Sequence, residues 1–476
     1  MFSNTELLFF INKYIYIYVL CFHVTLQGSS LRLVLMVLAA GTGGTLQYGY
    51  NLAIMNAPTT FIQTFINETV RERWAVQLED YQVTLVWTII VSIFSLGGLA
   101  GALITGPMSI HLGRKKCLLV NNVFLMAGAL FAVTSRVARS FEMIIISRIL
   151  VGINCGIGMN VQPMYFGESA PKHLRGAVSL TSAVFAAFGV MLGQVVGLRE
   201  ILGSEPCWQY LLASNAIPGL IQLLTLPWFP ESPRYLLIDR GDKEACIKAL
   251  RTLRGCEVQS SELDEILQEQ AETQGMRPRR IWELFPDRSV RWQLISVIII
   301  SSAMQLCGND SVRMGSCLCG DILLELTDRR HLTKPRYCIL GFSLSEEKND
   351  NDSYRYFVII SGVTGVLPTE IFNQAARPAA YMIAGSMMWI NLFIVGMVFP
   401  FLVSGLKEYC FVPFAVVCLL SAVYVGMFLP ETQGKTLSVI TSEFNRLNFK
   451  GQNQKHSVSP TEAQYQLGEV LHSTSL

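Results

Sequence analysis

The sequence predicts an all-α integral membrane protein built from two helical bundles. Hydrophobic residues make up 51% of the 476 residues and charged residues only 15%, a balance typical of multi-span membrane proteins. One short signature occurs twice, as PESPRYLL from Pro230 and as PETQGKT from Pro430. Each copy follows an acid and a base seven residues apart, which are Glu168 with Arg175 and Glu370 with Arg377. This repeat indicates two related membrane halves.

Six apolar runs precede the first signature, and a helix of about 20 residues crosses the hydrocarbon core. We expect spans at 31–55, 82–106, 117–138, 141–165, 177–198 and 208–229. The basic loops LGRKK from Leu112 and PKHLRG from Pro171 are cytoplasmic by the positive-inside rule. The loop 57–81 is then extracellular, where Asn67 begins an Asn-Glu-Thr triplet and is a candidate N-glycosylation site. Residues 31–229 are thus expected to form a complete six-span bundle.

The segment 230–291 is charged and helix-favouring. We expect a cytoplasmic linker of short surface helices here. Its simplest interpretation is a solvated connector without chemistry.

The second half, 292–429, is shorter than the first. Apolar runs are clear at 379–402 and 411–429, but the stretch 313–355 is rich in charges. Each charge at mid-bilayer costs about 2.5 to 3.5 kcal/mol, so we expect this stretch to be a polar extracellular insert. If the short run 357–372 crosses, the second signature is cytoplasmic like the first. The second half is then truncated to about four spans, with about ten in the chain.

The two ends of the chain lie outside these bundles. Residues 1–30 form an atypical apolar segment that contains Asn12, Lys13 and His23. We expect it to lie at the membrane interface; an uncleaved signal anchor and a non-native leader are the alternatives. Residues 430–476 are expected to form a cytoplasmic tail.

The charges and cysteines exclude several classes of function. The net charge is +2 and the basic residues are scattered among acids, so there is no nucleic-acid footprint. One dense group, Cys317, Cys319, His331 and Cys338, is spaced too irregularly for a usual zinc site, and we expect neither a metal nor a cofactor. An enzyme is not expected either, because the sequence has no nucleophile-and-base set and no phosphate loop.

Charged residues at the ends of the runs are candidates for a conformational latch. Carboxylate and guanidinium pairs at the inner surface can hold two halves together and release when the halves part. The alternative is that these charges only fix the topology. The latch candidates are Arg114, Arg148, Glu168, Arg175, Glu231, Arg234, Glu370, Arg377 and Glu431.

Uncharged amides within the runs suggest a polyhydroxyl solute, because each hydroxyl needs both a donor and an acceptor. The candidate substrate-binding residues are Gln47, Asn51, Asn56, Gln305, Asp310 and Asn391. Other amides in the runs are Asn160, Gln162 and Gln194. For each of them, a hydrogen bond between helices is the equal alternative. Glycines such as Gly97, Gly98, Gly152 and Gly156 indicate close helix packing rather than ligand contact.

These motifs resemble the facilitative hexose transporters, the sugar-porter branch of the major facilitator superfamily. The resemblance rests on GGTLQYGYN from Gly43, LGRKK, PMYFGESAPKHLRG from Pro163, PESPRYLL, QLCGND from Gln305, TEIFNQAARPAA from Thr369 and PETQGKT. It covers about 31–312 and 362–436, and its departures are most like the class II branch associated with fructose and glucose. It implies the two-bundle fold of that superfamily in a lipid bilayer. It also implies cation-independent hexose transport by alternating access across the plasma membrane.

Some family positions differ here. The sugar-contacting Gln of the fifth span falls on Ala183, the Trp of the tenth on Gly365 and an Asn of the eleventh on Met388. In the seventh span Gln305 is kept, while Asp310 stands for an Asn. The family's spans eight and nine have no counterpart. Two alternatives stay open, a transport-inactive splice or gene-model variant acting only through partners, and a proton-coupled or organic-anion carrier suggested by Asp310.

Overall fold

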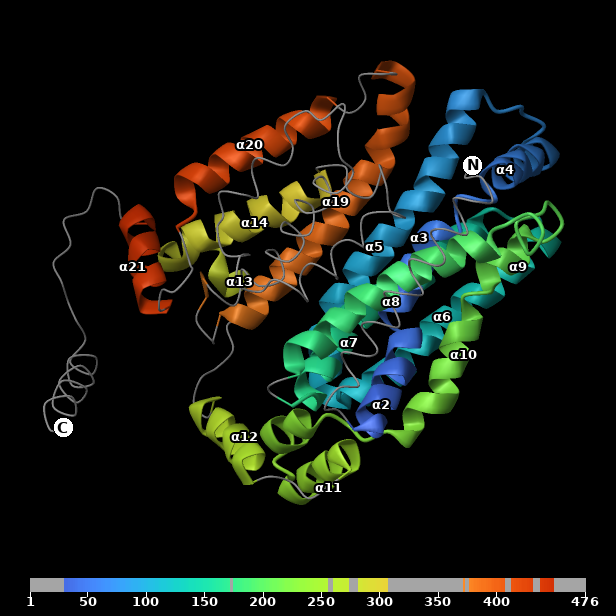
Figure 1. Cartoon of the computed structure of the whole chain (residues 1–476). Coiled ribbons are helices and arrows are strands. Elements are labelled where there is room, and N and C mark those ends of the chain that lie inside the picture. Colours follow the sequence, from blue (N-terminus) through green and yellow to red (C-terminus); the bar gives the residue numbers. More distant parts are fainter. Residues whose placement is uncertain are drawn as a thin grey trace, which may run out of the picture.

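The computed structural model describes residues 30–171, 174–255, 260–273, 281–306, 371–372, 376–406, 412–430 and 437–448. These residues fold into helices with no strand among them (Figure 1). Several predicted features lie outside the described residues: the N-terminal segment up to 29, the insert 313–355, the Cys317 group, Asp310, Glu370 and Glu431. The expected count of ten spans therefore stays a prediction.

The first half contains four long helices. They are α5 (Asp80–Leu112), α6 (Arg114–Val137), α7 (Glu142–Ser169) and α8 (Arg175–Val196). Glycines bring α5 and α7 together: an added methyl group on Gly97 would lie 2.3 Å from the Ile149 carbonyl oxygen, and one on Gly156 only 2.1 Å from that of Gly98. The predicted close packing at these glycines is confirmed.

The first span of this half, predicted as one run, is two helices. They are α2 (Leu31–Thr42) and α3 (Thr45–Ala53), separated by Gly43 and Gly44. Both glycines lie against other side chains: an added methyl group on Gly43 would lie 2.2 Å from the Gln222 amide oxygen, and one on Gly44 1.9 Å from the Gln162 amide oxygen. The amphipathic helix α4 (Thr59–Trp74) follows in the predicted outer loop and buries Ile62 and Ile66 against the bundle.

The sixth span is also broken, into α9 (Trp208–Ala213), α10 (Ala216–Thr225) and the 3-10 turn η1 (Leu226–Trp228). Pro218 lies in the first turn of α10 and has no N–H to donate to the Ser214 carbonyl. The helix therefore breaks at Ser214 and Asn215. Both breaks leave backbone groups inside the bundle that other side chains must satisfy.

The described part of the second half consists of α14 (Arg291–Leu306), α19 (Arg377–Leu406), α20 (Val412–Phe428) and the amphipathic α21 (Leu437–Asn448). Trp292 stacks on Phe428 with ring centroids 5.3 Å apart, which holds α14 against α20. Asn448 accepts from the Trp292 backbone N–H at 3.0 Å, so α21 is held at the start of α14. In Figure 1 these helices form a separate group beside the first half.

The linker folds into short helices. Two of them, α13 (Ile281–Leu284) and the 3-10 turn η3 (Arg288–Val290), pack against the second half. The other three, the π-helix η2 (Tyr235–Asp239), α11 (Lys243–Arg254) and α12 (Ser260–Thr273), lie below the first half (Figure 1). Leu237, Cys246, Leu250 and Ile266 form a small buried cluster among them.

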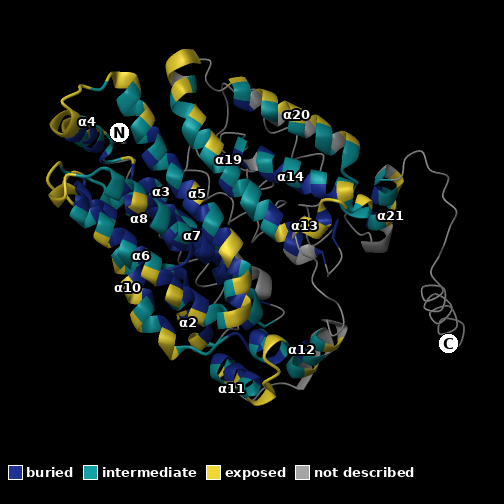
Figure 2. Cartoon of the chain, turned by 180° about the vertical axis from the view of Figure 1, so that it is seen from behind, coloured by how far each residue is buried: buried dark blue, intermediate teal, exposed yellow. Residues whose placement is uncertain are grey.

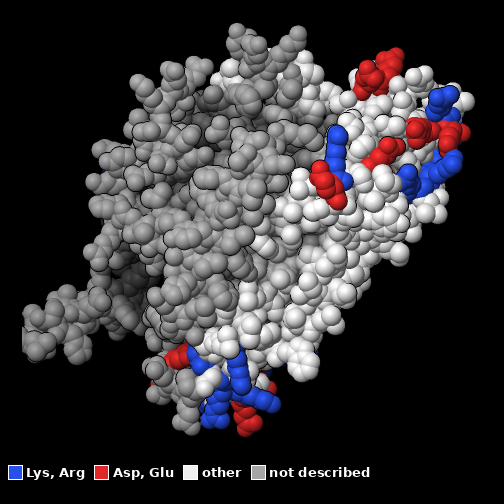
Figure 3. Space-filling model, turned by 45° about the vertical axis from the view of Figure 1, so that its right-hand side comes forward, with Lys and Arg blue, Asp and Glu red and all other residues white. Residues whose placement is uncertain are grey.

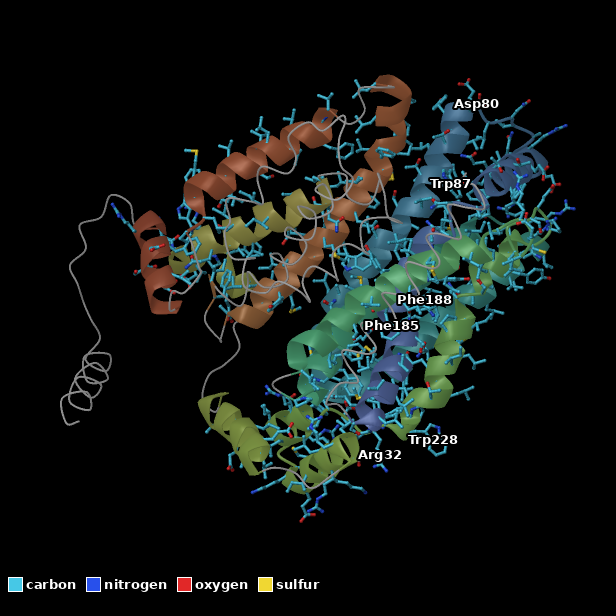
Figure 4. All side chains as sticks on the ribbon, viewed as in Figure 1. Arg32, Asp80, Trp87, Phe185, Phe188 and Trp228 are labelled. Carbon is cyan, nitrogen blue, oxygen red and sulfur yellow. The ribbon has the colours of Figure 1, made fainter. Side chains whose placement is uncertain are left out.

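Charge separates the two ends of the first half. In Figure 3 the Lys, Arg, Asp and Glu side chains of the visible described surface gather at the two ends, with an uncharged band between them. Figure 4 places Asp80 at one end and Arg32 with Trp228 at the other. Five helical segments of the described chain are long and apolar enough to cross a membrane: 80–112, 114–137, 142–169, 208–228 and 379–406. The uncharged band is where the hydrocarbon of a bilayer fits.

Candidate functional site

Charged side chains converge where α6 begins, α7 ends and the linker starts. We call Arg114, Glu168, Glu231 and Asp239 the inner charge cluster. The Arg114 guanidinium donates to Glu168 at 2.9 and 3.1 Å and to Asp239 at 2.7 Å. The Arg114 and Glu168 side chains are only 13% and 17% exposed. Charge-assisted bonds of this kind, out of bulk water, are among the stronger polar contacts in proteins.

Glu231 belongs to the first signature and caps α6. Its carboxylate accepts from the backbone N–H groups of Arg114 at 2.9 Å and of Lys115 at 2.7 Å. Gly113 makes this approach possible, because its φ is +89° and an added methyl group would lie 2.7 Å from the Glu231 carboxylate. Ser232, the next residue, donates to Glu168. The signature therefore joins the start of α6 to the end of α7, and its acid complements the positive end of the α6 dipole.

The linker is attached to the same end of α7. Arg254 at the end of α11 pairs with Glu262 on α12 at 2.6 Å and donates to the Ser169 carbonyl at 3.0 Å. A cation at this position satisfies the last carbonyls of α7. Burial raises the pKa of the nearby Cys246 thiol to about 11, so this cysteine is unreactive. The linker from η2 to α12 is therefore packed on the first half.

The predicted latch residues lie in different parts of the structure. Arg114, Glu168 and Glu231 lie together, and Arg234 follows in the same signature at the start of η2. Arg175 and Arg377 begin α8 and α19 at matching places in the two halves. Among the described residues, the inner charge cluster bonds within the first half and the linker. It does not bridge the two halves there.

Arg148 lies elsewhere, and its assignment to the inner charges is wrong. It is in the second turn of α7, twenty residues before Glu168, which is about 30 Å along a helix. It is 4% exposed, its guanidinium lies 4.5 Å from the Phe94 ring centroid, and it donates to the Asn51 carbonyl at 3.4 Å. No carboxylate contacts it within the described chain, because its neighbours are the apolar and amide side chains of the bundle interior.

The predicted substrate amides Gln47 and Asn51 lie inside the first half, where both are buried. Gln47 donates to the Asn215 carbonyl at 2.8 Å, at the break between α9 and α10. The Asn51 amide N–H donates to the Gln47 carbonyl at 2.9 Å, and its oxygen accepts from Asn215 at 3.1 Å. In return, Gln222 on α10 donates to the Ala40 carbonyl at 2.8 Å, at the break between α2 and α3. Each of the two broken spans donates a side-chain hydrogen bond to a backbone carbonyl at the break in the other. For Gln47 and Asn51 this is a hydrogen bond between helices, the alternative to sugar binding.

The remaining predicted substrate residues lie apart from this network. Asn391 on α19 donates to Ser302 on α14 at 3.0 Å, and Gln305 is buried one turn further along α14. Asn56 is exposed after the end of α3, where its backbone carbonyl accepts from Thr59 at 3.1 Å.

The two halves meet along α5 and α19, which lie side by side in Figure 1. Trp389 of α19 is 1% exposed and packs edge-on against Phe94 and Tyr48, with centroids 5.9 and 5.7 Å away. An added methyl group on Gly98 of α5 would lie 2.3 Å from the Trp389 ring. We call these four residues the seam. Figure 2 shows the buried core of the first half along α3, α5 and α7, next to it.

The seam was not predicted from the sequence. Trp389 itself was not singled out from the sequence; its neighbour Met388 was, because it stands where the family has an Asn. An apolar tryptophan within an apolar run gives no polarity or spacing signal. Only its pairing with a glycine on another span reveals the contact.

Comparisons with known proteins agree with this architecture. The family model described as "Sugar (and other) transporter" matches residues 36–317 and 356–444. The chain is 46% identical to human "Solute carrier family 2, facilitated glucose transporter member 11" over 93% of this chain and 98% of that one. It is 39% identical to the member 5 transporter of Ovis aries, over 87% of this chain and 92% of that one. These relatives are transporters rather than enzymes.

The fold has solved counterparts. The inward-open xylose transporter of E. coli superposes with a TM-score of 0.65 at 21% identity, over 85% of this chain and 98% of that one. A second structure of that transporter, carrying two tryptophan substitutions, gives a TM-score of 0.66. At this identity the likeness concerns the fold alone.

The match is interrupted at one place. Residues 318–355 lie outside the family model, and they fall within the insert predicted at 313–355. The alignment with the human relative is 491 positions long although the chain has 476 residues, so that relative has residues without a counterpart here. The family model, the curated relatives and the two-bundle fold agree on the rest: this chain belongs to the sugar transporter family of the major facilitator superfamily.

Proposed function

We propose that this chain is a facilitative hexose carrier of the plasma membrane that moves fructose or glucose by alternating access. The observation that carries the proposal is the 46% identity to the human facilitated glucose transporter member 11, across 98% of that relative. The member 5 transporters extend the same relationship at lower identity. Facilitated transport by these relatives is the activity that we extend to this chain.

The geometry supports alternating access, which needs two bundles that move as units. In the first half, reciprocal amide bonds join the two broken spans, and the inner charge cluster joins α6, α7 and the linker. We propose that this cluster holds the linker in place during the cycle. A matching cluster of Glu370, Arg377 and Glu431 is proposed for the second half.

The sugar is proposed to bind between the halves. In Gln47 and Asn51 both the amide nitrogen and the amide oxygen already bond to protein groups, so these residues serve the shape of the site rather than the sugar. From the predicted set we retain Gln305 and Asn391 on the second half as sugar contacts. We add Asn160 on α7, whose side-chain oxygen would be 3.9 Å from a methyl group on Gly385 of α19. Amide side chains on both halves suit a polyhydroxyl ligand, because an amide offers a donor and an acceptor.

Uncoupled transport is favoured over proton coupling. The buried side chains in the described part of the chain include no aspartate or glutamate. A proton-coupled carrier needs a titratable acid in its membrane interior. Asp310 is the one sequence feature that favours the proton-coupled alternative, and it lies outside the described residues.

A transport-inactive role is the second candidate. It is favoured by the interrupted family match between 317 and 356, since a carrier without one hairpin has an incomplete wall on its second half.

Uptake of labelled fructose and glucose into vesicles containing the purified chain separates these functions. Facilitated transport predicts that labelled sugar enters until its internal and external concentrations are equal, and that an imposed proton gradient does not change this end point. Accumulation driven by the gradient favours the coupled alternative. Flux no greater than in protein-free vesicles contradicts transport and favours the inactive role.

A further inference from the structure

Half-helix α3 has both of its ends inside the first half. The break at Gly43 and Gly44 detaches it from α2, and Thr45 and Ala53 at its two ends are only 4% and 6% exposed. Some of its terminal groups are satisfied by the neighbouring backbone; the Asn56 N–H, for example, donates to the Ala53 carbonyl at 3.2 Å. The other first N–H groups and last carbonyls need partners inside the bundle. Whatever satisfies these ends also fixes the position of the helix.

Helix α8 packs along the whole of α3, and Thr45 donates to the Ser182 carbonyl of α8 at 2.8 Å. Helix α7 makes side-chain hydrogen bonds to the backbone at both ends. The Gln162 side-chain oxygen accepts from the Thr45 N–H at 2.5 Å, and Arg148 donates to the Asn51 carbonyl at 3.4 Å, in the last turn of α3. Gln162 and Arg148 are fourteen residues apart, nearly four helical turns, so they project from the same side of α7. Gly44 leaves room for this contact, because a methyl group there would lie 1.9 Å from the Gln162 oxygen.

The polarity of the two contacts matches that of α3. The amino end of a helix carries a partial positive charge and the carboxyl end a partial negative charge. The acceptor Gln162 meets the amino end, and the cation Arg148 meets the carboxyl end. This accounts for a guanidinium that is buried without a carboxylate partner among the described residues. Its Nε also has no hydrogen bond there.

The two faces of α3 point to different parts of the molecule. Gln47 and Asn51 bond to Asn215 at the break in the sixth span. Tyr48 packs edge-on against Trp389 of the second half at 5.7 Å, and Leu52 belongs to the same apolar cluster. The position of α3 therefore sets where Tyr48 meets Trp389, beside the larger contact that α5 makes with α19.

We propose that Arg148 and Gln162 are positioning residues that hold α3 by its two ends and thereby fix Tyr48 against Trp389 at the seam. The role of this end-clamp in transport rests on the proposed function, because the halves must part and rejoin at the seam in each cycle. Neither residue contacts the sugar in this proposal.

Matched variants separate the clamp from simple packing. Gln162→Glu keeps an acceptor at the amino end of α3, whereas Gln162→Met keeps the length and loses the acceptor. Arg148→Lys keeps the cation, and Arg148→Met loses it. In vesicles with equal amounts of monodisperse protein, the two methionine variants are expected to lower the maximal uptake rate about tenfold with little change in KM. The Glu and Lys variants are expected to stay within about threefold of the parent.

The opposite order overturns the proposal. If packing alone matters, Gln162→Met keeps the maximal uptake rate of the parent, and Gln162→Glu lowers it because its carboxylate is buried. Gly44→Ala provides a second route, because its methyl group displaces the same acceptor. It is expected to behave like Gln162→Met, and parent-like uptake by Gly44→Ala contradicts the clamp.

A measurement without transport distinguishes the clamp from the proposed function. Leu52→Cys places a thiol on the α3 face at the seam, and its labelling by a membrane-impermeant maleimide reports how firmly α3 is held. Labelling of the parent chain gives the background from native cysteines. Gln162→Met and Arg148→Met are expected to speed labelling about fivefold or more, and Gln162→Glu and Arg148→Lys to leave it nearly unchanged. If this pattern appears without any hexose flux, the proposed function fails and the clamp stands; equal labelling in every variant overturns the clamp.

Discussion

Two arginines in the first half were both predicted as latch residues and have different environments. Arg114 at the inner end pairs with two carboxylates and retains some exposure to water. Arg148, in the second turn of α7 and buried inside the bundle, contacts an aromatic ring and a backbone carbonyl. Ion pairs form where water can still reach the charges, while a cation in the interior bonds to dipoles and a ring face. Depth in the bundle, rather than residue type, decides what each arginine does.

The largest expected effect is on the inner charge cluster. Glu168→Ala leaves the half-buried Arg114 with Asp239 alone, so the free energy of unfolding is expected to fall by about 3 kcal/mol and transport to fall sharply. Thermal unfolding of the purified protein and vesicle uptake measure the two effects. The control is Glu72→Ala, which breaks the exposed pair with Arg139, and it is expected to cost less than about 1 kcal/mol.

Arg148→Met tests the other side of the comparison. Removing a buried cation without a described carboxylate partner relieves a desolvation cost and loses a cation–π contact, so the free energy of unfolding is expected to change by less than about 1 kcal/mol. Uptake nevertheless falls, as the end-clamp requires. Arg114→Met is expected to lose about 3 kcal/mol in the same assay, because it leaves two carboxylates unpaired. If Arg148→Met and Arg114→Met lower the free energy of unfolding equally, the two arginines do not differ in their contribution to stability.

A smaller effect is expected at the seam. Gly98→Ala places a methyl group 2.3 Å from the Trp389 ring, so α5 and α19 must separate and uptake is expected to fall several-fold. Gly106→Ala on the same helix is the matched control, because its methyl group lies 3.5 Å from the flexible end of Met382. Trp389→Leu combined with Gly98→Ala is expected to restore part of the uptake. A Gly106 variant as impaired as the Gly98 variant would argue against a specific seam.

The sequence was informative where a signal repeats or lies close along the chain. The recurrence of the signature led to Glu231 and Glu168, the basic loop from Leu112 led to Arg114, and the structure places the three in contact. Hydropathy located the long helices α5, α6 and α7 to within a few residues. These features depend on local composition and on charges near membrane boundaries, which a single sequence displays directly.

The interior polar contacts were beyond the sequence because their partners come from other spans. Gln47 and Gln222 each satisfy a break in a distant helix, so neither the break nor the role of the amide has a local signature. Arg148 was grouped with the inner charges by residue type alone, although the predicted span 141–165 already put it near the end opposite to the basic loop from Pro171. Predicting its partners requires knowing that the end of α3 lies beside α7.

The smallest functional effect is expected from Asn67, which tests which end of the first half is outside. Asn67 is half-buried on α4, while Thr69 of the triplet is buried and donates to the Phe65 carbonyl at 2.7 Å. A glycan must therefore be attached before α4 packs. In cells, Asn67→Gln is expected to remove the mobility shift caused by glycosidase while leaving uptake unchanged, because α4 lies far from the seam. If the parent chain carries a glycan at Asn67, α4 is extracellular and the inner charge cluster, at the opposite end of the bundle, is cytoplasmic. If the parent chain carries no glycan at Asn67, this experiment gives no support for a cytoplasmic position of Arg114. The comparison of the two arginines then rests on their burial alone.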